Sequence, residues 1–73
     1  MSEKTEMMAD MVKNLAALLT EQNSGMTMEE ALATVFNSDT YRKIMDERTH
    51  FYHQSYYYVF AFLKEELTKG KFE

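Results

Sequence analysis

Residues 27–39 read TMEEALATVFNSD and contain the start of one helix, its apolar side and the start of the next helix. Thr27 and Glu30 have the spacing of a capping box, in which the threonine hydroxyl accepts from the Glu30 amide and the glutamate accepts from the Thr27 amide. An apolar face follows at Ala31, Leu32, Val35 and Phe36. Asn37-Ser38-Asp39 then predicts a break at which Ser38 caps another helix.

On the N-terminal side of this stretch the pattern predicts one long helix from about Thr5 to Gln22, ended by Asn23-Ser24-Gly25. Its apolar residues recur at three- and four-residue steps, which is the period of an amphipathic helix. They are Met8, Met11, Val12, Leu15, Leu18 and Leu19.

On the C-terminal side, Tyr41, Ile44 and Met45 give the third helix an inward stripe. Thr49 to Gln54 has no clear helical period, so loop and helix both stay open for it. Ser55 is a suitable cap for a last helix that ends near Lys69-Gly70. The core side of that helix is predicted to hold Tyr56, Val59, Phe60, Leu63 and Leu67.

The fold class that follows is all-α. With 73 residues, no proline and two glycines, the chain is predicted to be a single helical domain, 1–73, with frayed ends at 1–4 and 71–73. We expect a compact bundle of three to four helices, in which long first and last helices pack across each other and two short helices lie between them.

Composition excludes several kinds of protein. The chain has no cysteine, so it has no disulfide, thiolate metal site or cysteine nucleophile, and nothing in it indicates an oxidising compartment. Its first six residues lack the pattern of a secretory signal. The longest apolar run, Tyr56 to Leu63, is far shorter than the ~20 residues that span a bilayer. We therefore expect a cytoplasmic protein without a membrane partner.

Charge is also informative, because the formal net charge is −4. Residues 1–38 carry six acidic side chains against two lysines, and residues 39–73 carry six acidic and six basic ones. Nucleic-acid binding depends on clustered lysine and arginine, so this balance disfavours it. The alternative, a nucleic-acid-binding helical regulator, would present Arg42, Lys43 and Arg48, among which Asp46 and Glu47 lie.

His50 and His53 are three residues apart, and Asp46 precedes His50 by four. On a continuous helix these spacings would place three candidate metal ligands on one side. The alternative hypothesis is therefore a small metal- or ligand-binding domain centred on Asp46, His50 and His53. The competing interpretation is that both histidines form local hydrogen bonds at a loop or core edge, and no cofactor is predicted.

Aromatic residues are in surplus on the last helix. Tyr58 and Phe62 form a second stripe beside the core side, and Tyr57 points elsewhere again. They either complete the core of a small domain or form an exposed patch for a partner chain. The partner-binding candidates are thus Tyr57, Tyr58 and Phe62, and a two-fold dimer would bury Tyr58 and Phe62.

No catalytic pattern is recognisable. Ser24, Ser38 and Ser55 are explained by capping or turns, and no glycine-rich loop is present to hold a phosphate. Adjacent acids at Glu29-Glu30 and Glu65-Glu66 are interpreted as solvated faces. We expect no enzymatic activity. Of the seven methionines, Met7 and Met8 are the ones expected to be exposed.

A set of short motifs spans Met26 to Leu67, somewhat over half the chain: Glu29-Glu30-Ala31-Leu32, Phe36-Asn37-Ser38 with Tyr41, Asp46-Glu47, Ser55 with Tyr58-Val59, and Lys64-Glu65-Glu66-Leu67. In these motifs the chain resembles a group of small uncharacterised helical proteins of bacteria. It departs from them at Tyr56, where they often have proline.

The resemblance implies a compact helical domain without established catalytic residues. Some similar families have their genes beside those of toxin-like proteins, such as ADP-ribosyltransferase homologues, and the resemblance implies the same setting as an expectation for this chain. The function expected overall is a non-catalytic protein–protein interaction module, antitoxin-like or accessory, that binds a protein partner or a second copy of itself.

Overall fold

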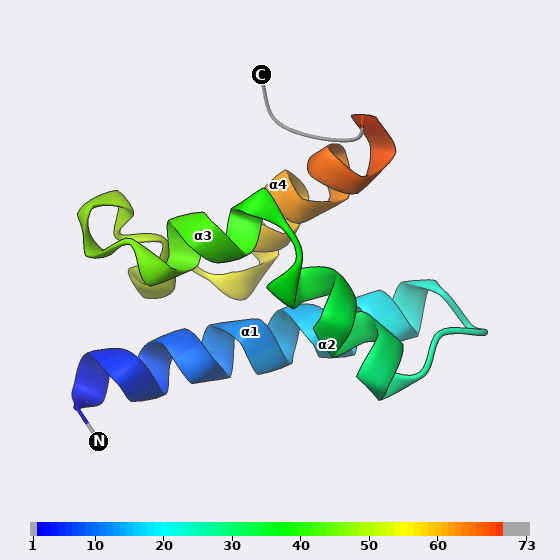
Figure 1. Cartoon of the computed structure of the whole chain (residues 1–73), viewed down its shortest axis with the longest axis horizontal. Helices are drawn as coiled ribbons and strands as arrows, with labels where there is room; N and C mark the ends of the chain where they lie inside the picture. Colours follow the sequence, from blue (N-terminus) through cyan, green and yellow to red (C-terminus); the bar gives the residue numbers. More distant parts are fainter. Residues whose placement is uncertain (1, 70–73) are drawn as a thin grey trace.

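The computed structural model describes residues 2–69, and within them the chain forms four α-helices and no strand (Figure 1). The helices are α1 (Glu3–Gln22), α2 (Met28–Phe36), α3 (Asp39–Met45) and α4 (Tyr56–Lys69). Two short 3₁₀ turns, η1 (Glu47–Thr49) and η2 (Phe51–His53), connect α3 to α4. The predicted all-α bundle, with long first and last helices and two short ones between them, is confirmed.

Helix α1 is the element against which the others are assembled. It contacts α2, α3 and α4, and α2 lies across its C-terminal half (Figure 1). All four helices contribute to one core, whose completely buried apolar side chains include Leu15, Val35, Ile44 and Leu63. Each such side chain stabilises the fold by roughly 1.5–3 kcal/mol relative to an exposed position.

Helix starts follow the predicted capping residues. The capping box of α2 is complete, with the Glu30 amide 3.1 Å from the Thr27 hydroxyl and the Thr27 amide 2.9 Å from the Glu30 carboxylate. The Ser38 hydroxyl accepts from the Tyr41 amide and the Ser55 hydroxyl accepts from the Tyr58 amide. Both predicted serine caps are therefore confirmed.

The two chain ends differ from expectation in one respect. Ser2 caps α1 through the Thr5 amide, so the helix begins two residues before the predicted Thr5 and includes Lys4. Two residues of the stretch 1–4 that was predicted to fray, Glu3 and Lys4, are thus helical, while residue 1 and residues 71–73 lie outside the described residues. Gly70, the predicted end of the last helix, lies outside them as well.

Several predicted core positions are wrong. Met45, Tyr56 and Leu67 are exposed, because α3 ends at Met45, Tyr56 is at the open start of α4, and Glu66 takes the inward position beside Leu67. In the opposite sense, Met8 is buried and not exposed. It precedes Met11 by three residues and Leu15 by seven, which places it on the inward face of α1.

The segment from Thr49 to Gln54 is neither an α-helix nor a simple loop. Its two 3₁₀ turns meet at His50, whose φ of 58° is in the left-handed region. The Thr49 hydroxyl accepts from the Phe51 amide at 3.2 Å, which ties the two turns together. As a result Tyr52 is buried against the core and Phe51 is half-buried.

Within residues 2–69, none of the helices has both the length and the apolar character needed to cross a bilayer.

Candidate functional site: an apolar groove between three helices

A groove lies where α1, α2 and α3 meet, and it encloses about 320 Å³. Its lining is mainly apolar and comes from all three helices: Thr5, Met8, Ala9, Val12, Lys13, Leu32, Phe36, Tyr41 and Met45. On α1 these residues recur at three- and four-residue steps and so lie on one side of the helix. Leu32 and Phe36 of α2 and Tyr41 and Met45 of α3 form the remaining walls.

Two large side chains project at the border of the groove. Phe36, the last residue of α2, is 52% exposed, and Met45, the last residue of α3, is 43% exposed. The Phe36 ring packs edge-to-face on Tyr41, with ring centroids 5.1 Å apart and planes at 79°. This contact fixes the direction in which Phe36 projects, since aromatic pairs favour this geometry.

Charges along the α1 side of the groove are largely unpaired. Lys13 lines the groove, and exposed Glu6 and Asp10 lie on the same helix. Among residues 2–69 none of the three has an ion-pair partner. Near the start of α1, by contrast, Lys4 binds Glu47 at 2.8 Å, and this hydrogen bond raises the pKa of Lys4.

A second exposed apolar surface is the tyrosine face, which we define as Tyr56, Tyr57 and Tyr58 at the start of α4. Tyr57 is 65% exposed and Tyr58 is 51% exposed. The Tyr56 and Tyr57 rings lie 4.8 Å apart. Two of the three predicted partner-binding residues are thus available at the surface.

Phe62, the third predicted partner-binding residue, is half-buried. The Phe51 ring from η2 packs 5.1 Å from Phe62 and 6.4 Å from Tyr58, and Tyr58 and Phe62 are 5.3 Å apart. Of the two alternatives left open for this stripe, core or exposed patch, Phe62 thus fits the first in part, because the chain itself partly covers it.

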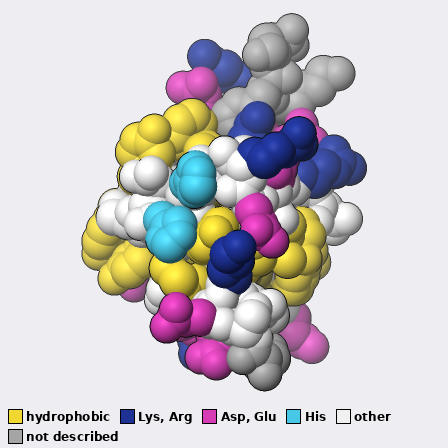
Figure 2. Space-filling model, turned by 90° about the vertical axis from the view of Figure 1, so that its left-hand side faces the viewer, with side chains coloured by type: hydrophobic (Ala, Val, Ile, Leu, Met, Phe, Trp, Pro, Cys, Tyr) yellow, Lys and Arg dark blue, Asp and Glu magenta, His cyan; other side chains and the backbone are white. Residues whose placement is uncertain are grey.

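The three candidate metal ligands do not form one group. His50 and His53 are exposed at one end of the molecule, next to each other and beside hydrophobic side chains (Figure 2), with ring centroids 6.1 Å apart. Asp46 is instead paired with Arg48, whose Nε and Nη2 atoms lie 3.0 and 2.9 Å from its carboxylate oxygens. Hydrogen bonds from the Arg48 side chain, and then from its amide, lower the pKa of Asp46 to about 2.

The continuous helix on which that metal set depended is replaced by the two 3₁₀ turns. In the part of the chain that the structure describes, no three histidine or acidic side chains are grouped closely enough to hold a metal ion.

The predicted basic cluster is interspersed with acids. Arg42 pairs with Asp39 and Arg48 pairs with Asp46. A shallow hollow next to them is lined by two acids and two bases, together with Thr49. Nucleic-acid binding through Arg42, Lys43 and Arg48 stays a prediction.

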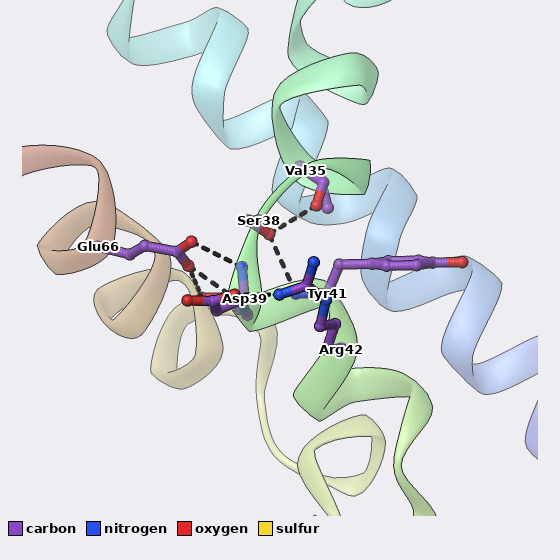
Figure 3. Close-up of polar contacts among 7 residues, drawn as sticks. Val35, Ser38, Asp39, Tyr41, Arg42 and Glu66 are labelled. Carbon is purple, nitrogen blue, oxygen red and sulfur yellow. Dashed lines mark hydrogen bonds and ion pairs between the residues drawn. The ribbon is translucent and has the colours of Figure 1, made fainter. Parts of the chain in front are cut away.

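Glu66 has a role that the sequence interpretation missed. It was expected on a solvated face, but it is only 6% exposed. Its carboxylate accepts hydrogen bonds from the Asp39 amide at 2.6 Å, the Thr40 amide at 3.0 Å and the Thr40 hydroxyl at 2.8 Å (Figure 3). These donors include free amides of the first turn of α3, where a negative charge is favourable.

The Glu66 contacts bind α4 to the beginning of α3 and so fix the helix that carries Tyr41 and Met45. The available sequence signal was the position of Glu66, three residues after Leu63 and seven after Val59, on the buried side of α4. Glu66 therefore positions one wall of the groove without lining it.

No family model, curated protein or solved structure matches the chain.

Proposed function

We propose that this chain is a non-catalytic protein-interaction module and that the apolar groove between α1, α2 and α3 is its docking surface. The observation that carries the proposal is the combination of a hollow of about 320 Å³ with large apolar side chains projecting at its border. Exposed apolar surface next to polar residues is typical of interaction sites.

The chemistry of the lining favours a protein over a small molecule. Small-molecule sites usually place several convergent polar groups in an apolar pocket. In this groove the polar lining residues are Thr5, Lys13 and Tyr41, and the other six are apolar. Apolar side chains from a helical surface match such a lining, as in other complexes where a helix lies in a groove.

The absence of catalysis is part of the proposal. Three hydroxyls that would be candidate nucleophiles already accept from helix amides, those of Ser2, Ser38 and Ser55. The buried carboxylate, Glu66, is engaged by three donors. Each of these groups has a structural role that accounts for its position.

The cellular setting is also proposed. A chain without cysteine suits the cytoplasm, and the predicted antitoxin-like or accessory role would use the groove to hold a protein partner. The resemblance to small helical bacterial proteins suggests a toxin-like protein as one such partner.

A comparison of baits tests this function. Tagged wild-type protein, Phe36→Asp and Leu67→Asp are each used to capture proteins from the cells that produce the chain, and recovered proteins are quantified. Leu67 is an exposed apolar residue outside the groove, so it is a matched control. We expect a protein recovered by the wild type and Leu67→Asp and lost with Phe36→Asp. Equal recovery by all three baits would contradict the assignment of the groove.

A further inference from the structure

We infer that the occupant of the groove is the same groove of a second copy, the two copies being related by a two-fold axis. This inference rests on the proposed function and adds the identity of the partner. In a two-fold interface the same patch is present on both sides, so the patch must be complementary to itself. A patch is complementary to itself when it has a projecting side chain next to a hollow that can receive the same side chain of the second copy.

The groove has both parts. Phe36 and Met45 project at its border, while the small Ala9, the buried Val12 and the half-buried Leu32 form the hollow. When two such patches face each other, the projecting side chains of each copy can enter the hollow of the other. Aromatic and methionine side chains are enriched at the centres of such interfaces.

Helix α1 determines how the two copies align. Thr5, Ala9 and Lys13 follow one another at steps of four along the groove, and the first two are small enough to allow close helix approach. A two-fold axis beside Ala9 makes the two α1 helices antiparallel. Lys13 of one copy then lies opposite Thr5 of the second copy, next to its Glu6.

Charge complementarity supports this alignment. The first 38 residues contain only two basic side chains, and Lys4 is paired with Glu47, whereas Lys13 has no ion-pair partner within the described range 2–69. Glu6 is exposed and has no ion-pair partner among residues 2–69. The antiparallel alignment brings Lys13 to Glu6 of the second copy twice, once on each side of the axis. Each copy carries a net charge of −4, and the two Lys13–Glu6 contacts, about one helical turn from the axis, offset part of the repulsion between the copies, including that between the two Asp10 side chains next to Ala9.

The size of the groove predicts a reversible dimer. Nine residues line it, whereas tight complexes use about 20–30 residues on each side. We therefore expect dissociation in the micromolar range.

Sedimentation equilibrium of the full chain, from low micromolar to millimolar concentration, tests the dimer. We expect the wild type to dimerise and Phe36→Asp to weaken association by about a hundredfold or more, since it places a charge in the apolar centre. Met45→Lys should act in the same direction. Tyr58→Asp is the control at an exposed aromatic outside the groove and should leave association unchanged. Circular dichroism confirms that each variant is folded.

A charge exchange tests the alignment. Lys13→Glu or Glu6→Lys alone should weaken the dimer about tenfold, because each makes like charges face each other at two symmetric points. The double variant Glu6→Lys/Lys13→Glu restores opposite charges and should return to within about threefold of the wild type. Failure of the double variant to recover would overturn this alignment.

Two results would overturn the inference of a second copy. One is a wild-type monomer over the whole concentration range. The other is dimerisation that survives Phe36→Asp and is lost in Tyr58→Asp, which would place the contact on the tyrosine face. If the wild type is monomeric and a bait still captures a protein in a Phe36-dependent way, the inferred partner is wrong while the proposed function stands. If the wild type is monomeric and no bait captures a protein in a Phe36-dependent way, the inferred second copy and the proposed function are both wrong.

Discussion

The groove and the tyrosine face both expose large apolar side chains, but they differ in shape and in how they are held. The groove is concave, and three helices supply its walls. The tyrosine face is one turn of one helix, where Tyr56 packs against Tyr57 and Tyr58 packs against Phe51 and Phe62. Each tyrosine also has a hydroxyl that water can solvate.

This difference shows that a surplus of aromatic residues does not by itself identify a docking surface. Aromatic rings that pack on their neighbours already gain part of the energy that a partner would provide. The hollow between helices offers apolar surface that only another molecule can cover. The predictions below separate the two surfaces, beginning with the one for which we expect the largest effect.

Removal of the Glu66 carboxylate should cause the greatest loss, because it leaves the Asp39 and Thr40 amides at the start of α3 without their acceptor. We expect Glu66→Ala to lower the free energy of unfolding by about 2–4 kcal/mol, as measured by urea denaturation. Glu65→Ala is the matched control, since Glu65 is exposed and pairs with Lys69 at the long distance of 4.0 Å.

We expect the control to change stability by less than about 0.5 kcal/mol. Glu66→Gln keeps one acceptor oxygen and should fall between the two. Equal losses for Glu65→Ala and Glu66→Ala would show that α3, and with it the groove wall, is not held by this carboxylate.

Truncating one exposed aromatic on each surface compares them directly. Phe36→Ala removes the edge-to-face contact with Tyr41 and should lower the free energy of unfolding by about 1 kcal/mol. Tyr57→Ala, at a more exposed position, should lower it by less than about 0.5 kcal/mol. Both are measured by denaturation at concentrations where the wild type is monomeric. A larger loss for Tyr57→Ala would reverse the ranking of the two surfaces.

The stability of the protein at acid pH should depend on Asp46, which caps the 3₁₀ turn η1 directly after Met45. The hydrogen bond from Arg48 holds the pKa of Asp46 at about 2, below the 3.8 of an unperturbed aspartate. A carboxyl whose pKa is lowered on folding stabilises the fold above its unfolded pKa and loses this effect as the pH falls towards its folded pKa. Between about pH 4 and pH 2, the stability of Asp46→Asn should therefore decrease less than that of the wild type. Arg48→Ala should reduce the same pH dependence, and an unchanged slope in both variants would refute this account.

The smallest effect is expected from metal ions at the histidines near the tyrosine face. Because the Asp46 carboxylate is bound by Arg48, we expect zinc or nickel to change the melting temperature equally in the wild type and in His53→Ala. A rise in the wild type that disappears in His53→Ala would instead support the metal-binding hypothesis.

The sequence predicted the elements of the fold well because its signals were local. The Thr27 capping box and the Ser38 and Ser55 caps each involve residues three positions apart, and all three form as expected. The apolar period of α1 likewise gave its buried face, Met8 included, and only the separate expectation that Met8 is exposed was wrong.

The groove and the Glu66 contact could not be predicted in the same way. Ala9, Leu32 and Met45 come together only when three helices have packed, and no local spacing records their angles. The Glu66 acceptors and their donors are separated by 26 and 27 residues. The local spacing places Glu66 on the buried side of α4, but it gives no sign of the distant amides that its carboxylate binds.

The most direct test of the groove as the surface that binds a second copy is a dilution series followed by amide and methyl NMR of the wild-type protein. The account predicts that the resonances which shift with concentration belong to the groove, including Ala9, Leu32, Phe36 and Met45, while those of Tyr56, Tyr57 and Tyr58 stay in place. Shifts concentrated on the three tyrosines, with the groove resonances unchanged, would contradict it.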